Sequence, residues 1–289
     1  METSPQGTAL FHLPGLFEFY DLYAAFLPLY RAHREYFYDW CAIGSIYGAP
    51  SDCLWAGGRV EYSDRTPREV LALTREYGIS ARLTLSNSLL RPEHLTDPDC
   101  NALCRLFQEQ NDPQNGAIIH AELLTQYLKK NYPSLYLVSS TTKVLTDFND
   151  LQRELARPEF RYVVPDFRLN RAFDRLAALP QSQKDKVEFL CNECCWFGCT
   201  ERRACYEAVS RKNLGLPGPE HHCSALGAAD GYRFSRAMAS AAAIAMIPVD
   251  ITLFLLMFFG YLNLLSLRIY GMQGVTPRWL PRYRSTAAS

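Results

Sequence analysis

Short apolar runs alternate with amphipathic segments along most of the chain. The runs are rich in branched and aromatic side chains, as buried parallel strands are, and the segments between them have the spacing of amphipathic helices. This alternation predicts repeated βα units. The eight runs predicted to form strands span residues 10–14, 40–46, 80–86, 116–121, 135–139, 162–166, 186–191 and 264–269.

Helices are predicted between these strands, and several carry start and stop signals. The run Thr66-Pro67-Arg68-Glu69 has the pattern of a capping box with proline at the first helical position, and Gly78 is suited to end that helix. Asp147 is suited to begin a later helix. The eight predicted helices span residues 20–35, 66–77, 99–110, 122–131, 147–156, 169–179, 200–211 and 249–259.

Eight strands with intervening helices predict an α/β fold, a single (β/α)8 TIM-like barrel over residues 1–275 with a Cys-rich loop after the seventh strand. A doubly wound open sheet is the alternative. Residues 276–289 are predicted to form a basic, Pro-containing C-terminal tail.

Composition narrows the class of protein only a little. The chain has 289 residues, is 48% hydrophobic and carries 30 basic and 30 acidic residues, so it can bury a large core and has no net charge. A neutral chain is not suited to non-specific adhesion to nucleic acid, although a local basic groove is compatible with it.

Six of the ten cysteines lie between residues 191 and 223. Residues 1–15 show no basic region followed by an apolar core and a cleavage site, so we expect a reducing, cytoplasmic setting in which thiols act as metal ligands rather than disulfides. The six cysteines of this region are Cys191, Cys194, Cys195, Cys199, Cys205 and Cys223.

Thiolates three or four residues apart after a strand can reach one metal centre, and an all-sulfur shell suits an iron-sulfur cluster, with zinc as the alternative. A third interpretation is that no metal binds here and that these cysteines are small residues of the apolar core. The predicted ligands are Cys195, Cys199, Cys223 and, in the fourth place, Cys191. Other candidates for that fourth place are Cys53, Cys194, Cys205, His221 and His222.

Polar residues follow the predicted strands where a barrel would place its active site. The candidates are Asn87, His120, Glu122, Lys143, Asp166, Arg168, Asn170, Asn192 and Arg268. His120, Glu122 and Lys143 are the predicted catalytic residues, and the other six are predicted to bind substrate. Alternatively these strand ends simply meet solvent, with Asp166 and Arg168 as an ordinary surface ion pair.

The segment 186–206, with Asn192, Cys195, Cys199, the Arg202-Arg203 pair and a tyrosine, resembles the cysteine region of the collagenase-like peptidase family. The run Ser139-Ser140-Thr141-Thr142-Lys143 is similar to uncharacterised bacterial members of that group. The family consists of TIM-barrel proteins and includes oxygen-independent, iron-sulfur-containing hydroxylases of ubiquinone precursors and of RNA.

This resemblance implies an iron-sulfur cofactor and a small aromatic or RNA substrate. Two departures from the family stand out, because few of its cysteines have a match here and Cys205 stands where relatives more often have histidine. We expect hydroxylation rather than peptide cleavage, since no HExxH motif or Ser/His or Cys/His signature is present.

The run 237–267 is apolar and contains one charged residue, Asp250. It is long enough for a transmembrane helix, but Pro248, Gly260 and Asn263 interrupt it, which favours a helix and a strand of the barrel. Three hypotheses therefore stand: an iron-sulfur enzyme, a zinc-clipped barrel that acts as a binding or accessory protein with a protein partner, and a membrane-attached protein anchored through 237–267.

Overall fold

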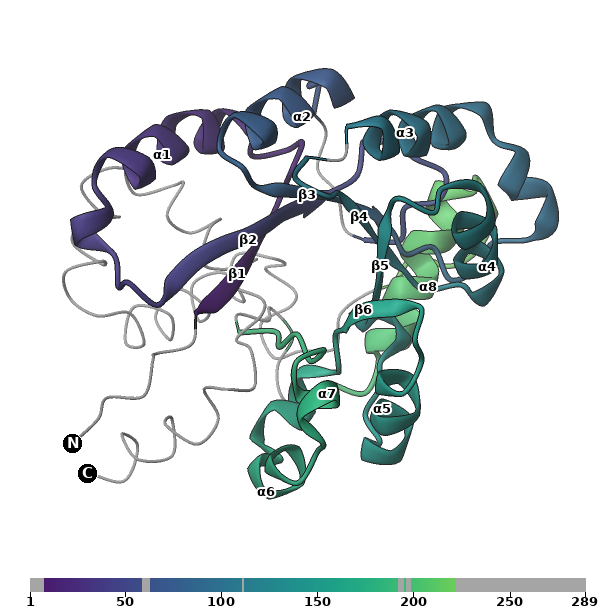
Figure 1. Cartoon of the computed structure of the whole chain (residues 1–289). Helices are drawn as coiled ribbons and strands as arrows, with labels where there is room; N and C mark the ends of the chain where they lie inside the picture. Colours follow the sequence, from purple (N-terminus) through teal and green to yellow (C-terminus); the bar gives the residue numbers. More distant parts are fainter. Residues whose placement is uncertain (1–7, 59–62, 111, 192–194, 196–198, 222–289) are drawn as a thin grey trace.

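The computed structural model describes residues 8–58, 63–110, 112–191, 195 and 199–221 (Figure 1). These residues form one parallel sheet of six strands, and the order of the strands in the sheet is their order in the sequence. The strands are β1 (Ala9–Pro14), β2 (Cys41–Gly48), β3 (Ser80–Leu85), β4 (Gly116–Ile119), β5 (Tyr136–Ser139) and β6 (Phe160–Val163).

Helices connect the strands, and Figure 1 shows α1 to α5 on the convex side of the curled sheet. The α-helices are α1 (Tyr20–Ala32), α2 (Pro67–Glu76), α3 (Pro98–Glu109), α4 (Glu122–Asn131), α5 (Phe148–Leu155), α6 (Phe173–Ala177), α7 (Gln181–Lys184) and α8 (Arg202–Asn213). Short 3-10 helices are η1 (Arg34–Tyr36), η2 (Pro92–Thr96), η3 (Thr141–Lys143) and η4 (Phe167–Arg171).

The helix signals of the sequence are confirmed. Thr66 Oγ1 accepts from Glu69 N (3.3 Å), and Glu69 Oε2 accepts from Thr66 N (2.7 Å), which completes the capping box at the start of α2. Gly78 follows α2 with a φ of 65°, a left-handed conformation that glycine adopts without strain. Asp147 Oδ1 accepts from Asn149 N (2.8 Å) at the start of α5.

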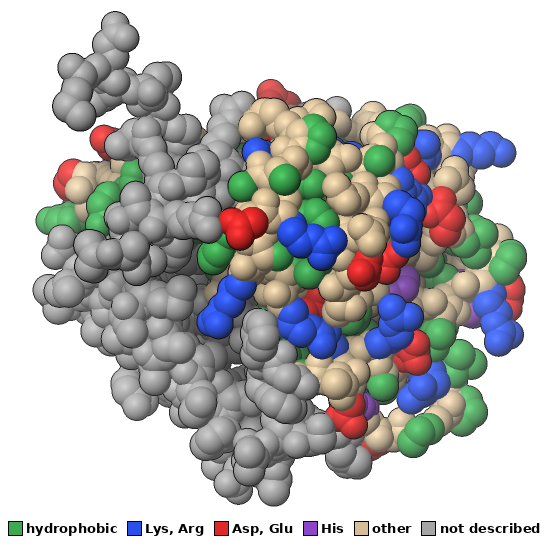
Figure 2. Space-filling view, turned by 90° about the horizontal axis from the view of Figure 1, so that it is seen from below, with side chains coloured by type: hydrophobic (Ala, Val, Ile, Leu, Met, Phe, Trp, Pro, Cys, Tyr) green, Lys and Arg blue, Asp and Glu red, His purple; other side chains and the backbone are tan. Residues whose placement is uncertain are grey.

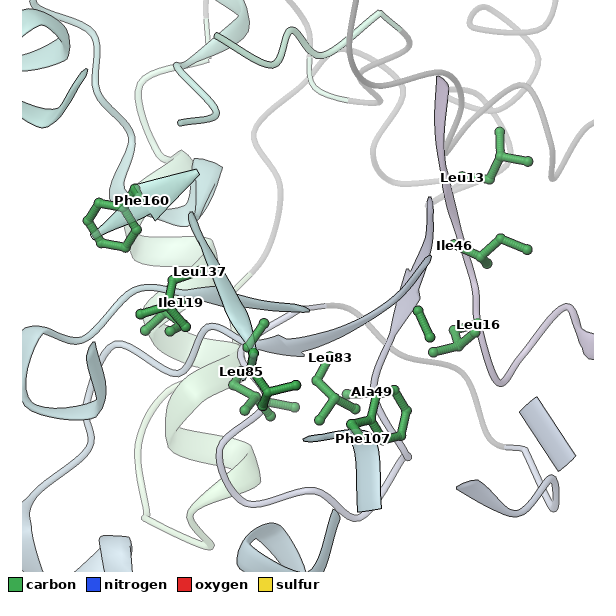
Figure 3. Packing of buried hydrophobic residues seen from close by; sticks show 14 of the residues in the cluster. Leu13, Leu16, Ile46, Ala49, Leu83, Leu85, Phe107, Ile119, Leu137 and Phe160 are labelled. Atoms are coloured by element: carbon green, nitrogen blue, oxygen red, sulfur yellow. The ribbon is translucent and has the colours of Figure 1, made fainter. Parts of the chain in front are cut away.

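Each strand presents alternate residues to the two sides of the sheet. Leu83 and Leu85 of β3 belong to the main apolar core together with Phe107 of α3 (Figure 3). Because side chains alternate along a strand, Arg82 and Thr84 point to the opposite, concave side. A smaller apolar cluster lies apart from the main core and contains Ile118, Val138, Val164 and Leu190.

The prediction of a closed (β/α)8 barrel is wrong. The described residues form an open sheet of six strands, in which no described strand pairs with the free edge of β1, and a barrel closes only when its last strand pairs with its first. The predicted seventh strand, 186–191, joins β6 through a single bridge between Val163 and Val187. The predicted eighth strand, 264–269, lies outside the described residues. The sheet is not doubly wound either, because its strand order never reverses.

Two further predictions fall on parts of the chain beyond the described ranges. The apolar run 237–267 and the tail 276–289 both lie there, so the division into residues 1–275 and 276–289 stays a prediction. Within the described ranges, no helix combines the length and the apolar composition that crossing a bilayer requires.

Candidate functional site at the carboxyl edge of the sheet

One buried carboxylate ties the cysteine region to the carboxyl edge of the sheet. Asp166 follows β6 and has no exposed side-chain surface. Its Oδ1 accepts from Arg168 Nε (2.6 Å) and its Oδ2 accepts from Arg202 Nη1 (2.8 Å), at the start of α8. Arg168 Nη1 also donates to the carbonyl oxygen of Cys199 (2.8 Å). Asp166 therefore fixes both the Cys199 backbone and the first residue of α8.

The ionisation of Asp166 agrees with this arrangement. Burial by itself would raise the pKa of its carboxyl, but the hydrogen bonds from Arg168 and the charge of Arg202 outweigh burial and hold the pKa below its ordinary value. The group is a buried carboxylate with two guanidinium partners, and not the surface ion pair considered from the sequence.

The predicted metal ligands divide between described and undescribed residues. Cys199 is buried and Cys195 is half-buried, while Cys223 lies outside the described ranges. Cys191 is half-buried, and burial raises the pKa of its thiol to about 12, which favours the protonated form. Among the described residues, no three His, Cys, Asp or Glu side chains converge as a metal site would require. Any metal centre here needs ligands from beyond that part of the chain.

His120 follows β4 and its ring contacts a pair of hydroxyl groups. Its Nδ1 lies 2.9 Å from Thr142 Oγ1, and Thr142 Oγ1 donates to Ser140 Oγ (2.9 Å). In a neutral imidazole one ring nitrogen carries the proton and the other carries a lone pair. Burial, assisted by the charges of Lys143 and Arg203, lowers the pKa of His120 to about 4. The ring is neutral at physiological pH.

The other two predicted catalytic residues are held by ion pairs. Lys143 Nζ donates to Glu154 Oε1, which also accepts from Ser139 Oγ, and burial lowers the pKa of Lys143. The Glu122 side chain is 56% exposed and accepts from Arg157 Nη2 (2.6 Å) at the surface. The catalytic roles of both residues stay predictions.

The predicted substrate-binding asparagines hold loops in this structure. Asn87 Nδ2 donates to the carbonyl oxygens of Leu54 (3.1 Å) and Ser210 (3.2 Å), which joins the end of β3 to α8. Asn170 Nδ2 donates to Leu190 O (2.7 Å). Helix α8 thus runs along the carboxyl edge from Asp166 to Asn87. Asn192 and Arg268 lie outside the described residues.

A second charged cluster, not predicted from the sequence, lies on the concave side of the sheet. Arg82 and Glu188 are each 1% exposed, and Arg82 Nη1 donates to Glu188 Oε2 (2.7 Å). Arg82 Nε donates to the hydroxyl oxygen of Tyr136 (2.7 Å), and His12 Nδ1 lies 2.8 Å from Ser45 Oγ. We call these five residues the interior cluster. One feature of the sequence could have indicated this cluster, because Arg82 and Glu188 are charged residues within apolar runs.

Because burial lowers the pKa of His12 to about 4, folding should depend on pH. His12 is neutral in the folded protein and binds a proton near pH 6.5 when unfolded. Its contribution to the free energy of unfolding is therefore complete above pH 6.5 and is lost as the pH falls toward 4. We expect His12→Gln to reduce this acid-side loss by about 3 kcal/mol at most. Urea unfolding at several pH values checks this. If the free energy of unfolding of His12→Gln depends on pH as steeply as that of wild type, the prediction is contradicted.

Comparisons with known proteins show one distant likeness. No protein-family model matches the sequence, and no curated protein matches it. The structure of the U32 peptidase Mk0906 is 15% identical in sequence, with 76% of this chain and 83% of that chain covered at a TM-score of 0.46. This likeness transfers no activity to the present chain. The resemblance to the collagenase-like peptidase family therefore stays a resemblance.

Proposed function

We propose that this chain is an enzyme with a thiolate-bound metal centre at the carboxyl edge of its sheet, in which Cys195 and Cys199 supply two ligands. The observation that supports this best is the Asp166 anchor, because a buried ion pair holds the carbonyl group of Cys199 in place. An iron-sulfur cluster is the proposed centre and zinc the alternative. A bound cluster would supply electron transfer.

The donor chemistry suits such a centre in part. Thiolates are ligands for iron-sulfur clusters and zinc, and a nearby guanidinium favours the thiolate form. Arg168 interacts electrostatically with Cys199. Cys223 is the proposed third ligand, and Cys191 is the proposed fourth, although its thiol has to lose a proton first.

His120 is the proposed proton-transfer residue of the same edge. The neutral ring has one nitrogen with a lone pair, and Thr142 contacts the ring at Nδ1. With a pKa of about 4 the neutral ring is a weak base at neutral pH, so it can relay a proton that the reaction generates but does not retain it. Thr142 is the proposed positioning residue, since its hydroxyl lies 2.9 Å from Nδ1.

We propose a redox reaction on a small molecule, of the oxygen-independent hydroxylation type. Peptide cleavage has less support, because the His12 and Ser45 pair is fully buried and cannot present its hydroxyl to a polypeptide. RNA also has less support than a small molecule, because Lys and Arg side chains are interspersed with Asp and Glu on the face in Figure 2.

Metal analysis tests the centre directly. We expect the full chain, purified without oxygen, to contain iron and inorganic sulfide and to show a visible charge-transfer band. The variants Cys195→Ser and Cys199→Ser should each lose most of the iron and most of the sulfide. Cys41→Ser is the matched control, because Cys41 is half-buried at the start of β2. Zinc without sulfide would instead support the accessory-protein alternative. Wild-type protein without either metal would refute the proposal.

A further inference from the structure

The interior cluster brings charged residues from distant parts of the chain to the concave side of the sheet. His12 lies on β1, Arg82 lies on β3, and Glu188 follows β6 at the single bridge. None of the three side chains is more than 3% exposed. Burying charged groups costs several kcal/mol, and well-packed apolar side chains often serve folding equally well. Folding stability alone therefore does not explain why these charged groups are buried.

The cluster leaves hydrogen-bonding capacity unused. Glu188 Oε1 is buried and has no hydrogen-bond partner in the part of the chain that the structure describes. A guanidinium has five N–H donors, and the described hydrogen bonds of Arg82 use three of them, toward Tyr136, Glu188 and His12. Glu188 Oε1 is thus an unused acceptor, and Arg82, which is bonded to Glu188, has further N–H groups that are unused donors.

The same side of β3 carries two more such oxygens. Thr84 Oγ1 and Ser86 Oγ are buried without a hydrogen-bond partner among the described residues. Arg82 and Thr84 alternate with the core residues of β3, so they point to the same side of the sheet, and Ser86 directly follows the last residue of the strand. Buried polar atoms without partners are rare in folded proteins and indicate a bound molecule or water.

From this arrangement we infer that the concave side of the sheet binds a small organic anion that also carries a hydroxyl or amino group. Arg82 would bind the anionic group, and Glu188 Oε1 and Thr84 Oγ1 would bind the donor. A second cation lies beside the interior cluster, because the Arg161 guanidinium lies over the rings of Tyr136 (4.8 Å) and Tyr162 (5.6 Å). The inference is independent of the metal centre, since none of these residues is a proposed metal ligand.

Calorimetric titration of the full chain with three probes tests this inference. Lactate carries both the carboxylate and the hydroxyl, propionate lacks the hydroxyl, and propane-1,2-diol lacks the carboxylate. We expect lactate to bind and propionate to bind about tenfold more weakly, the effect of one hydrogen bond to a charged group. Propane-1,2-diol should bind more weakly still, because it offers Arg82 no anionic group. The same pattern in Cys199→Ser protein would separate this site from the metal centre.

Thr84→Val is the decisive variant, because it keeps the shape of the side chain and removes a hydroxyl that bonds to no described residue. We expect it to fold with wild-type stability and to bind lactate several-fold more weakly. Thr125→Val, at a buried threonine of α4, is the matched control and should keep wild-type affinity. The inference is overturned if wild-type protein takes up no lactate, if the three probes bind equally, or if Thr84→Val binds lactate like wild type.

Discussion

Asp166→Ala is expected to lower the free energy of unfolding by about 3–5 kcal/mol, the usual cost of removing one partner from a buried ion pair. The substitution leaves the buried Arg202 guanidinium without its carboxylate and removes the hydrogen bonds that Asp166 accepts from Arg168. Both consequences fall on the segment that holds Cys199 and begins α8.

Urea unfolding of wild type and variant measures the loss in stability. Thiol labelling under native conditions measures local loosening around Cys199. Cys199 should react faster in the variant, because Arg168 no longer holds the carbonyl group of Cys199. Asp150→Ala is the matched control, since the Asp150–Arg153 pair is exposed on α5 and such pairs contribute about 0–1 kcal/mol. A loss of stability at Asp166 no larger than at Asp150 would show that the anchor does not support the loop.

The second large effect is expected at the interior cluster. Glu188→Ala should cost about 3–5 kcal/mol, because it leaves Arg82 charged and buried with neutral partners only. The double variant Arg82→Met/Glu188→Leu should recover most of that loss, since it removes both charges and fills the space with apolar side chains.

Chemical denaturation of the single variants Arg82→Met and Glu188→Leu and of the double variant Arg82→Met/Glu188→Leu completes a double-mutant cycle. A favourable coupling energy between Arg82 and Glu188 is the expected result. If the two single losses simply add in the double variant, the pair is not coupled, and the explanation for these buried charges fails. Lactate binding should disappear in the double variant even where its stability is restored.

The candidate site was predictable only in part. His120 directly follows β4, as the sequence pattern predicted. Cys195 and Cys199 do not follow a full strand, because the predicted strand 186–191 adds a single bridge. The partners of Asn87, Asp166 and Lys143 were not predictable, because they come from segments up to 123 residues away, as in the contact between Asn87 and Ser210. A polar residue after a strand looks the same in sequence whether it binds a ligand or a loop.

What the sequence by itself determined is the series of local elements. The six strands and the helices α1 to α6 and α8 lie within a few residues of their predicted positions, because apolar spacing, the Thr66 capping box and the Asp147 cap act over a few residues. Helix α7 was not predicted. Tertiary structure decided the rest. Whether a parallel sheet closes depends on pairing between strands far apart in the chain, and 186–191 adds a single bridge where the pattern predicted a full strand. The interior cluster likewise exists only because curling of the sheet brings His12, Arg82 and Glu188 within hydrogen-bonding range, although they are separated by 70 and 106 residues.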